Sequence, residues 1–210
     1  MENKKNYQKI LQNTIENIKN TGNKPTLLLH VCCGPCLTIP LKQLKEYFDI
    51  TLFFNNSNIY PKEEYDRRLN ELKHYLNESN NNDIPLIVKD YVGDDFLKII
   101  ELYKDLKEGY ERCRVCFKTR LNEGFEYAFN HGFNYFGTVM TISRYKNAQD
   151  INKIGEKLEA KYPTTKWLYA DFKKNNGYEN SLVICHDYNL YFQEYCGCKF
   201  SYLKYLEKHK

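Results

Sequence analysis

Short apolar runs of strand length alternate along this chain with amphipathic segments of helical length. Within each run the apolar residues are continuous and do not alternate with polar ones, which is typical of strands that are buried on both faces. Parallel strands joined by helices through right-handed crossovers bury both faces of a sheet. We therefore predict an α/β fold with a doubly wound, mainly parallel, five-stranded sheet.

The pattern places the elements along the sequence. The expected strands span residues 26–31, 50–54, 84–88, 133–139 and 166–170. The expected helices span residues 5–20, 35–47, 94–107, 113–131 and 148–161, with a further charged helix starting at Pro61. A C-terminal helical segment covers about residues 178–210. Because no internal repeat and no long linker interrupts the chain, we expect a single domain over residues 1–210.

The predicted sheet also places the binding site. Ligands of doubly wound sheets bind beyond the carboxyl ends of the strands, near the point where the strand order reverses. This rule brings four parts of the chain to one rim, namely the loop at Cys32, the loop Asn55–Asn58, the loop Thr138–Lys146 and Asp171.

Seven of the eight cysteines fall into three tight groups. They are Cys32, Cys33 and Cys36, then Cys113 and Cys116, then Cys196 and Cys198. Gly34 allows a tight turn after the first strand and Pro35 suits the first turn of a helix, so the first thiols face a helix N-terminus. The partial positive charge there lowers thiol pKa values, and thiolate is the form that binds a soft metal. The remaining Cys185 is expected to be a small buried side chain.

The cellular compartment decides how such cysteines are interpreted. No secretory signal pattern opens the chain, and no apolar stretch approaches the ~20 residues that a membrane span needs. We expect a cytoplasmic protein without a membrane partner, in which clustered cysteines are metal ligands or catalytic thiols more often than disulfides. The formal net charge of +4 permits a nucleic-acid partner but does not argue for one.

The second cysteine group leaves two metal sites open. Cys113 and Cys116 form a CxxC at the start of a predicted helix, where positions i and i+3 share a face. Two such pairs satisfy a structural zinc ion, although a chain of this size does not need a metal to fold. They equally suit a redox-active metal centre.

Six segments carry a resemblance to a known family. In chain order they are HVCCGPC, NNSNIYPKEEYDRR, RCRVCFKTRL, the stretch Thr138–Asn147 ending in SRYKN, DFKKNNGY and YCGCKFS. This ordered set resembles QueH-type epoxyqueuosine reductases over about residues 25–203. The resemblance implies an iron-sulfur enzyme that converts epoxyqueuosine at the wobble position of tRNA into queuosine without cobalamin. It also implies similarity to the adenine nucleotide α-hydrolase (HUP) fold, which agrees with the predicted sheet.

The resemblance assigns roles to the cysteines. It implies that Cys32, Cys33, Cys113 and Cys116 bind a 4Fe-4S cluster, and that Cys196 and Cys198 are a redox-active pair. Cys36 would lie beside the cluster, where a second, mononuclear iron is a candidate. One departure is Arg144, which stands where the family usually has a proline and affects only the local loop shape.

The implied reaction explains why two kinds of thiol site are needed. Removing an epoxide oxygen to leave an alkene and water takes two electrons and two protons, whereas one cubane cluster passes one electron at a time. A Cys196–Cys198 dithiol releases two electrons when it forms a disulfide. An iron with an open position can act as a Lewis acid on the epoxide oxygen. His30 and Asp171 are candidate proton donors, although a histidine beside a strand is more often a core residue.

The implied partners are a tRNA with a GUN-type anticodon carrying epoxyqueuosine and an unidentified electron donor, and we expect a monomer. Candidate tRNA contacts are basic and aromatic residues near the predicted rim: Arg67, Arg68, Arg144, Lys146, Lys173, Lys174, Lys199, Tyr60 and Tyr145.

Two other functions remain open from the sequence. A tRNA-sulfurating enzyme on the same fold would use ATP and would carry a glycine- and serine-rich phosphate loop such as SGGxDS, where this chain has CCGPC. A non-catalytic zinc protein that binds RNA would be colourless and contain stoichiometric zinc, whereas a bound cluster would colour the protein brown.

Overall fold

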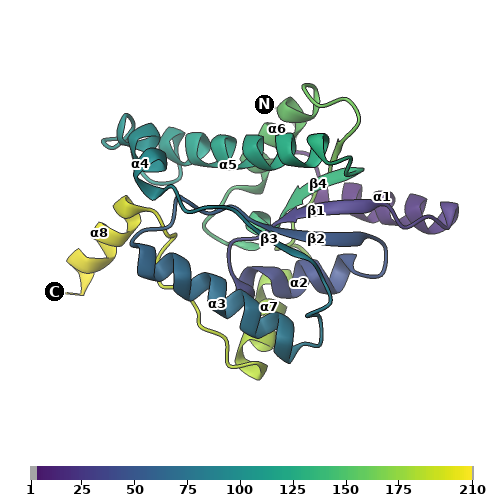
Figure 1. The fold of residues 1–210 in the computed structure, drawn as a ribbon, viewed down its shortest axis with the longest axis horizontal. Coiled ribbons are helices and arrows are strands. Elements are labelled where there is room, and N and C mark those ends of the chain that lie inside the picture. The colour runs from purple at the N-terminus through teal and green to yellow at the C-terminus, as the bar shows by residue number, and fades with distance from the viewer. Residues whose placement is uncertain (1–3, 210) are drawn as a thin grey trace.

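The computed structural model describes residues 4–209 and contains a five-stranded parallel sheet (Figure 1). Residues 1–3 and 210 of the predicted domain lie outside the described residues. The strands are β1 (Thr26–His30), β2 (Asp49–Phe54), β3 (Leu86–Val88), β4 (Tyr135–Thr138) and β5 (Lys166–Trp167). Their spatial order is β3-β2-β1-β4-β5, so the order reverses between β1 and β4. The predicted doubly wound parallel sheet is confirmed.

Helices cover both faces of this sheet (Figure 1). One face carries α2 (Gly34–Leu44), α3 (Lys62–Glu78) and α7 (Gly177–Asp187), and the other carries α5 (Glu111–Asn130) and α6 (Ala148–Glu159). The remaining elements are α1 (Tyr7–Thr21), α4 (Gly93–Glu101), the short 3-10 helix η1 (Val139–Ile142) and α8 (Lys199–Lys208). Within residues 4–209, no helix combines the length and the apolar character that a membrane crossing requires.

Alternate residues of the central strand pack into two separate cores. Leu27 and Leu29 of β1 face the core that α2 and α3 complete, whereas Leu28 faces the core that α5 completes through Phe125. All four side chains are fully buried. Burying each one stabilises the fold by roughly 1.5–3 kcal/mol, so β1 is a rigid platform for the loop that follows it.

The last strand is shorter than the sequence predicts. Its expected range of 166–170 is replaced by the two-residue strand β5. The reason is Asn152 of α6, whose side chain donates to the carbonyl of Ala170 at 2.8 Å and accepts from its amide at 3.3 Å. Because a side chain takes these backbone groups, they are not available to a neighbouring strand.

Other element ends differ by a few residues. The expected strand over 133–139 begins later, because the amide of Phe133 bonds to the carbonyl of Ala128 at the end of α5. The chain after β4 turns at once into η1, and α4 ends at Glu101 instead of continuing to residue 107.

The loops after three strands meet at one rim, as predicted. The Nδ1 of His30, the last residue of β1, lies 2.8 Å from Thr138 Oγ1 at the end of β4. Asn56, in the loop after β2, donates its side-chain amide to the carbonyl of Val31 at 2.8 Å. These contacts fix the loops that carry the candidate site.

Candidate metal centre and active-site cavity

Three buried thiols gather in the loop between β1 and α2. The sulfurs of Cys32, Cys33 and Cys36 all lie within 4.8 Å of one another, and those of Cys32 and Cys33 are 3.8 Å apart. Cys33 is the N-cap of α2, with Pro35 in the first turn. A Cβ on Gly34 would stand 2.9 Å from the carbonyl oxygen of Glu71 on α3, so only glycine fits here without a backbone shift.

This thiol triad stabilises a single negative charge. Hydrogen bonds from the thiols of Cys33 and Cys36 lower the pKa of Cys32 well below its usual value. Burial, together with the Cys32 charge, raises the pKa of Cys33. The hydrogen bond with Cys32, with burial, raises the pKa of Cys36 to about 12. One thiolate beside two protonated thiols is a preformed ligand set, and a metal that binds it releases the remaining protons.

The other two cysteine groups lie near each other, and we call these four residues the second thiol group and the triad the first. Cys113 and Cys116 lie at the start of α5, and Cys196 and Cys198 lie in the loop before α8. Burial raises the pKa of Cys113, and it raises the pKa of Cys116 to about 12; in both cases the nearby Cys196 and Cys198 add to the shift. The structure therefore brings Cys36 to Cys32 and Cys33, and brings Cys113 and Cys116 to the CGC pair. All eight cysteines are free thiols.

A buried ion pair fixes the CGC loop. Arg68 of α3 is 2% exposed and donates its Nε to Glu64 at 2.7 Å. Its two Nη atoms donate to the carbonyls of Cys196 and Tyr195 at 3.2 and 3.1 Å. Gly197 has a φ of +120°, a conformation that favours glycine. Arg68 is thus a structural residue of this loop, which corrects its prediction as a phosphate contact.

Replacing Arg68 with alanine is expected to destabilise the protein and release the CGC loop. Removing one partner of a buried pair leaves the Glu64 carboxylate uncompensated and costs about 3–5 kcal/mol. Denaturant unfolding measures the loss, and the rate of thiol labelling at Cys196 measures the release. As a control, Lys62→Ala removes an exposed pair with Asp66 on the same helix and should cost less than about 1 kcal/mol. Equal stability losses in the two variants would contradict the assigned role.

Three cations without carboxylate partners among residues 4–209 lie near the thiols: the buried Arg112 and Arg120 and the half-buried Lys146. The Nε atoms of Arg112 and Arg120 are buried and make no hydrogen bond within residues 4–209. Burial lowers the pKa of Lys146, but Cys196, Cys32 and Cys36 outweigh it and raise the pKa overall. Unpaired buried charge is costly unless an anion compensates it. Clustered cysteine sulfurs with surplus positive charge near them fit a thiolate-bound, negatively charged iron-sulfur group.

The predicted proton donor His30 lies inside a buried network. Its Nε2 is 3.2 Å from Nη2 of Arg120, which also donates to the side chain of Asn56. Burial, with the charge of Arg120, lowers the pKa of His30 to about 3. A neutral imidazole with both nitrogens engaged suits the positioning of Arg120. The environment does not favour proton delivery by His30, which stays a prediction.

The second predicted proton donor, Asp171, lies at the same rim but faces another cavity. Its carboxylate is 3.1 Å from Nζ of Lys173, which also donates to the carbonyl of Thr141 at 2.6 Å. Burial lowers the pKa of Lys173 despite this pairing. Asp171 lines the neighbouring cavity described below and not the one that contains the thiols.

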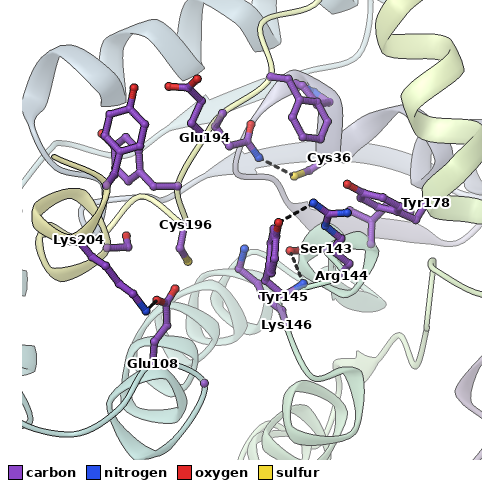
Figure 2. Close-up of a pocket in the computed structure, with 18 of the residues that line it drawn as sticks. Cys36, Glu108, Ser143, Arg144, Tyr145, Lys146, Tyr178, Glu194, Cys196 and Lys204 are labelled. Atoms are coloured by element: carbon purple, nitrogen blue, oxygen red, sulfur yellow. Dashed lines mark hydrogen bonds and ion pairs between the residues drawn. The ribbon is translucent and has the colours of Figure 1, made fainter. Parts of the chain in front are cut away.

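An open cavity of about 590 Å³ joins the two thiol groups (Figure 2). Cys36 and Cys196 lie on opposite sides of it, and Tyr145 and Lys146 stand between them. Gln193 donates to the sulfur of Cys36 at 3.7 Å. The cavity is large enough for a modified nucleoside, and it presents two thiols and an ammonium group to whatever enters.

Sequence reasoning missed part of this arrangement. It assigned Lys146 only to phosphate binding, and it gave no role to Glu64 within the site. The i, i+4 spacing of Glu64 and Arg68 on a predicted helix was the available signal for their ion pair. No local pattern marks the role of Lys146, because its surroundings come from distant parts of the chain.

Comparison with known proteins identifies the family of this chain. The sequence model of the family described as Epoxyqueuosine reductase QueH matches residues 27–204. This chain belongs to the QueH family. The matched range includes all eight cysteines, so both thiol groups lie within the part of the chain that the family model covers.

Individual QueH relatives match over nearly the whole chain. Epoxyqueuosine reductase QueH of Streptococcus pyogenes serotype M1 is 40% identical over 93% of this chain and 78% of its own length. The protein of the same name from Staphylococcus epidermidis is 41% identical over 97% of this chain and 88% of its own length. The one from Staphylococcus aureus is 40% identical over 96% and 86%.

Proposed function

We propose that this chain reduces epoxyqueuosine at the wobble position of tRNA to queuosine. The observation that carries the proposal is the QueH family match over residues 27–204, which covers the lining of the thiol-lined cavity from Pro35 to Lys204. The predicted tRNA-sulfurating alternative has no support, because the loop before α2 holds the thiol triad where a phosphate loop would lie.

The metal in this proposal is iron, in a 4Fe-4S cluster. Cys32 and Cys33 would hold it from the β1–α2 loop, with Cys113 and Cys116 of α5 as the further predicted ligands. Cys36 lies close enough to the first two to ligate the same cluster or a separate iron. Zinc also suits thiolates, but it has no redox chemistry and could not pass electrons to the epoxide. When bound, the cluster supplies single electrons at the cavity.

The residues of the chain account for both electrons and both protons of the reaction. Reducing the epoxide breaks two C–O bonds, forms an alkene and releases water, which requires two electrons and two protons. Oxidation of the Cys196–Cys198 dithiol to a disulfide provides the two electrons and releases two protons, one of which replaces the proton that Lys146 delivers to the epoxide oxygen. The free thiols in the structure correspond to the reduced state of this pair, and an external donor must reduce it again after each turnover.

Lys146 is the group that suits the epoxide oxygen. Its ammonium lies close enough to Cys32, Cys36 and Cys196 for each of them to raise its pKa, and it lines the cavity between the two thiol groups. An oxygen that leaves carbon as an alkoxide needs a positive charge and then a proton. We therefore assign to the Lys146 Nζ the binding of the epoxide oxygen and the delivery of its first proton.

The direct test is reduction of the substrate by anaerobically reconstituted protein. The protein is incubated with epoxyqueuosine-bearing tRNA and a strong reductant, without cobalamin, and the digested nucleosides are analysed by mass spectrometry. Queuosine is the expected product. Recovery of unaltered epoxyqueuosine from iron-replete protein would reject the proposed function.

Replacing Cys196 with serine separates the dithiol from the metal centre. We expect the variant to keep the iron content and the visible absorption near about 400 nm, but to lose multiple turnover, since no disulfide can form. Metal analysis and product yield measure the two properties. Loss of iron in Cys196→Ser would instead identify the CGC pair as metal ligands.

A further inference from the structure

A second cavity of about 1400 Å³ adjoins the active-site cavity. We call it the basic groove. It is bounded by α6, by the residues just before α1 and by the loop after β5. Three consecutive residues, Arg144, Tyr145 and Lys146, line both cavities and so form the boundary between them. A ligand that lies in the groove can therefore reach the thiol-lined cavity directly.

The groove holds the positive excess of the whole chain. Its lining includes eight cationic side chains: Lys4, Lys5, Arg144, Lys146, Lys153, Lys157, Lys173 and Lys174. Only three acidic side chains line it, which are Asp150, Glu156 and Asp171. The lining thus has five more cations than acids, whereas the formal net charge of all 210 residues is +4. The rest of the molecule is nearly balanced, so the groove is a localised site for a polyanion.

The arrangement of the lysines matches an extended anion. Lys153 and Lys157 are spaced by one helical turn along α6, and Lys173 and Lys174 follow β5. Some cations have internal partners, as Lys5 pairs with Glu156 at 2.7 Å. Lys157 and Lys174 are exposed, and the side chain of neither forms an ion pair or hydrogen bond with the rest of residues 4–209. Charge on both walls suits a backbone with regularly spaced phosphates.

The groove lacks the apolar surface that a membrane partner would need. Among the exposed large hydrophobic side chains of residues 4–209, Tyr145 alone lines it. Tyr145 is 75% exposed and stacks against Arg144, whose guanidinium carbon lies 4.8 Å from the ring centroid. A single aromatic ring beside a row of cations is the pattern of nucleic-acid recognition, in which a base stacks on the ring while phosphates meet the cations.

We propose that the basic groove binds the RNA backbone next to the wobble nucleotide, with Tyr145 stacking on a neighbouring base where the strand passes into the active-site cavity. This inference rests on the proposed function, since it names the surface that holds the same tRNA. It separates the candidate contacts of the sequence analysis, because Arg144, Lys146, Lys173 and Lys174 belong to the groove, whereas Arg67, Lys199 and Tyr60 do not. It adds four lysines that the sequence did not single out.

The test is RNA binding by a charge-reversed groove. The variant Lys157→Glu/Lys174→Glu changes one exposed residue on each wall, and the probe is a synthetic anticodon stem-loop RNA with a GUN anticodon. We expect at least about a tenfold weaker Kd at ~0.1 M salt, and a salt slope that is lower by about 2. The milder Lys157→Gln/Lys174→Gln should show the same change with smaller amplitude. Circular dichroism checks that each variant is folded.

The matched control is Lys42→Glu/Lys73→Glu, which makes the same charge change at two exposed lysines on α2 and α3 outside both cavities. Equal losses of affinity in the groove and control variants would overturn the proposal, as would unchanged RNA affinity with lost binding to anionic lipid vesicles. Because the probe is unmodified RNA and binding needs no turnover, the result is independent of whether the protein reduces epoxyqueuosine. With active protein, the groove variant should raise the KM for tRNA and leave kcat unchanged.

Discussion

Replacing Cys33 with serine is expected to remove the metal centre. Cys33 is 1% exposed, and its sulfur belongs to the only thiol triad in residues 4–209 whose ligand atoms are already within 4.8 Å of one another. A serine hydroxyl is a harder and more weakly acidic ligand than a thiol, so it does not replace the sulfur at iron. Loss of a residue that only orients a ligand costs 10–100-fold, so loss of the ligand itself should reduce activity by at least about 100-fold.

Iron analysis and the visible spectrum of anaerobically purified protein measure this outcome. The chain offers a matched control in Cys185, a buried thiol of α7 that packs in the core and whose pKa burial raises to about 12. Cys185→Ser makes the same chemical change at a similarly buried thiol outside the triad, and it should keep full iron content. If Cys33→Ser also kept it, Cys33 would not be a ligand.

Cys113→Ser decides how the two thiol groups share the metal. If Cys113 completes the cluster, as the family resemblance implies, Cys113→Ser should lose iron to the same extent as Cys33→Ser. If the triad alone nucleates the cluster, it should keep most of the iron. The groups that shift the pKa of Cys113 are its own burial and the neighbouring CGC thiols, and the triad is not among them. Iron analysis of Cys113→Ser therefore tests whether Cys113 reaches the metal held by the triad.

The sheet was predictable because its signal is local and strong. The continuous apolar runs at β1 and β2 face buried surroundings on both sides, so their composition alone indicates a parallel sheet. The position of the binding rim at the carboxyl ends of the strands was also predictable, because it depends only on the order of strands and helices along the chain. The end of β5 was not predictable, because the side chain of Asn152, far from it in sequence, takes the backbone bonds of Ala170.

The residue types of the site were predictable, but which cysteine groups lie next to each other was not. Tight cysteine spacing indicates metal or redox chemistry wherever the chain folds. Which groups meet depends on how the loop before α8 returns to α3, and this is fixed by Arg68 and by the positive φ of Gly197. The same holds for His30, which the sequence marks as a possible acid and the structure surrounds with Arg120 and Asn55.

Replacing Lys146 with methionine is expected to slow the chemical step while leaving the metal in place. The methionine keeps the length and apolar part of the side chain, so it removes the charge with little change in shape. Loss of a positioned acid costs typically 10²–10⁴-fold in rate, and we expect kcat to fall within about that range. Lys146→Arg keeps the charge and should restore part of the rate. Iron content should be unchanged in both variants, because an ammonium group is not a ligand.

The split between kcat and KM distinguishes this role from a phosphate contact. A lysine that only binds the RNA backbone would raise the KM for tRNA and leave the rate at saturation unchanged, as we expect for Lys157 and Lys174. Lys146 lines both cavities, so a modest rise in KM is expected as well. A single-turnover experiment with pre-reduced protein isolates the chemical step. A normal single-turnover rate in Lys146→Met would show that another group protonates the epoxide oxygen.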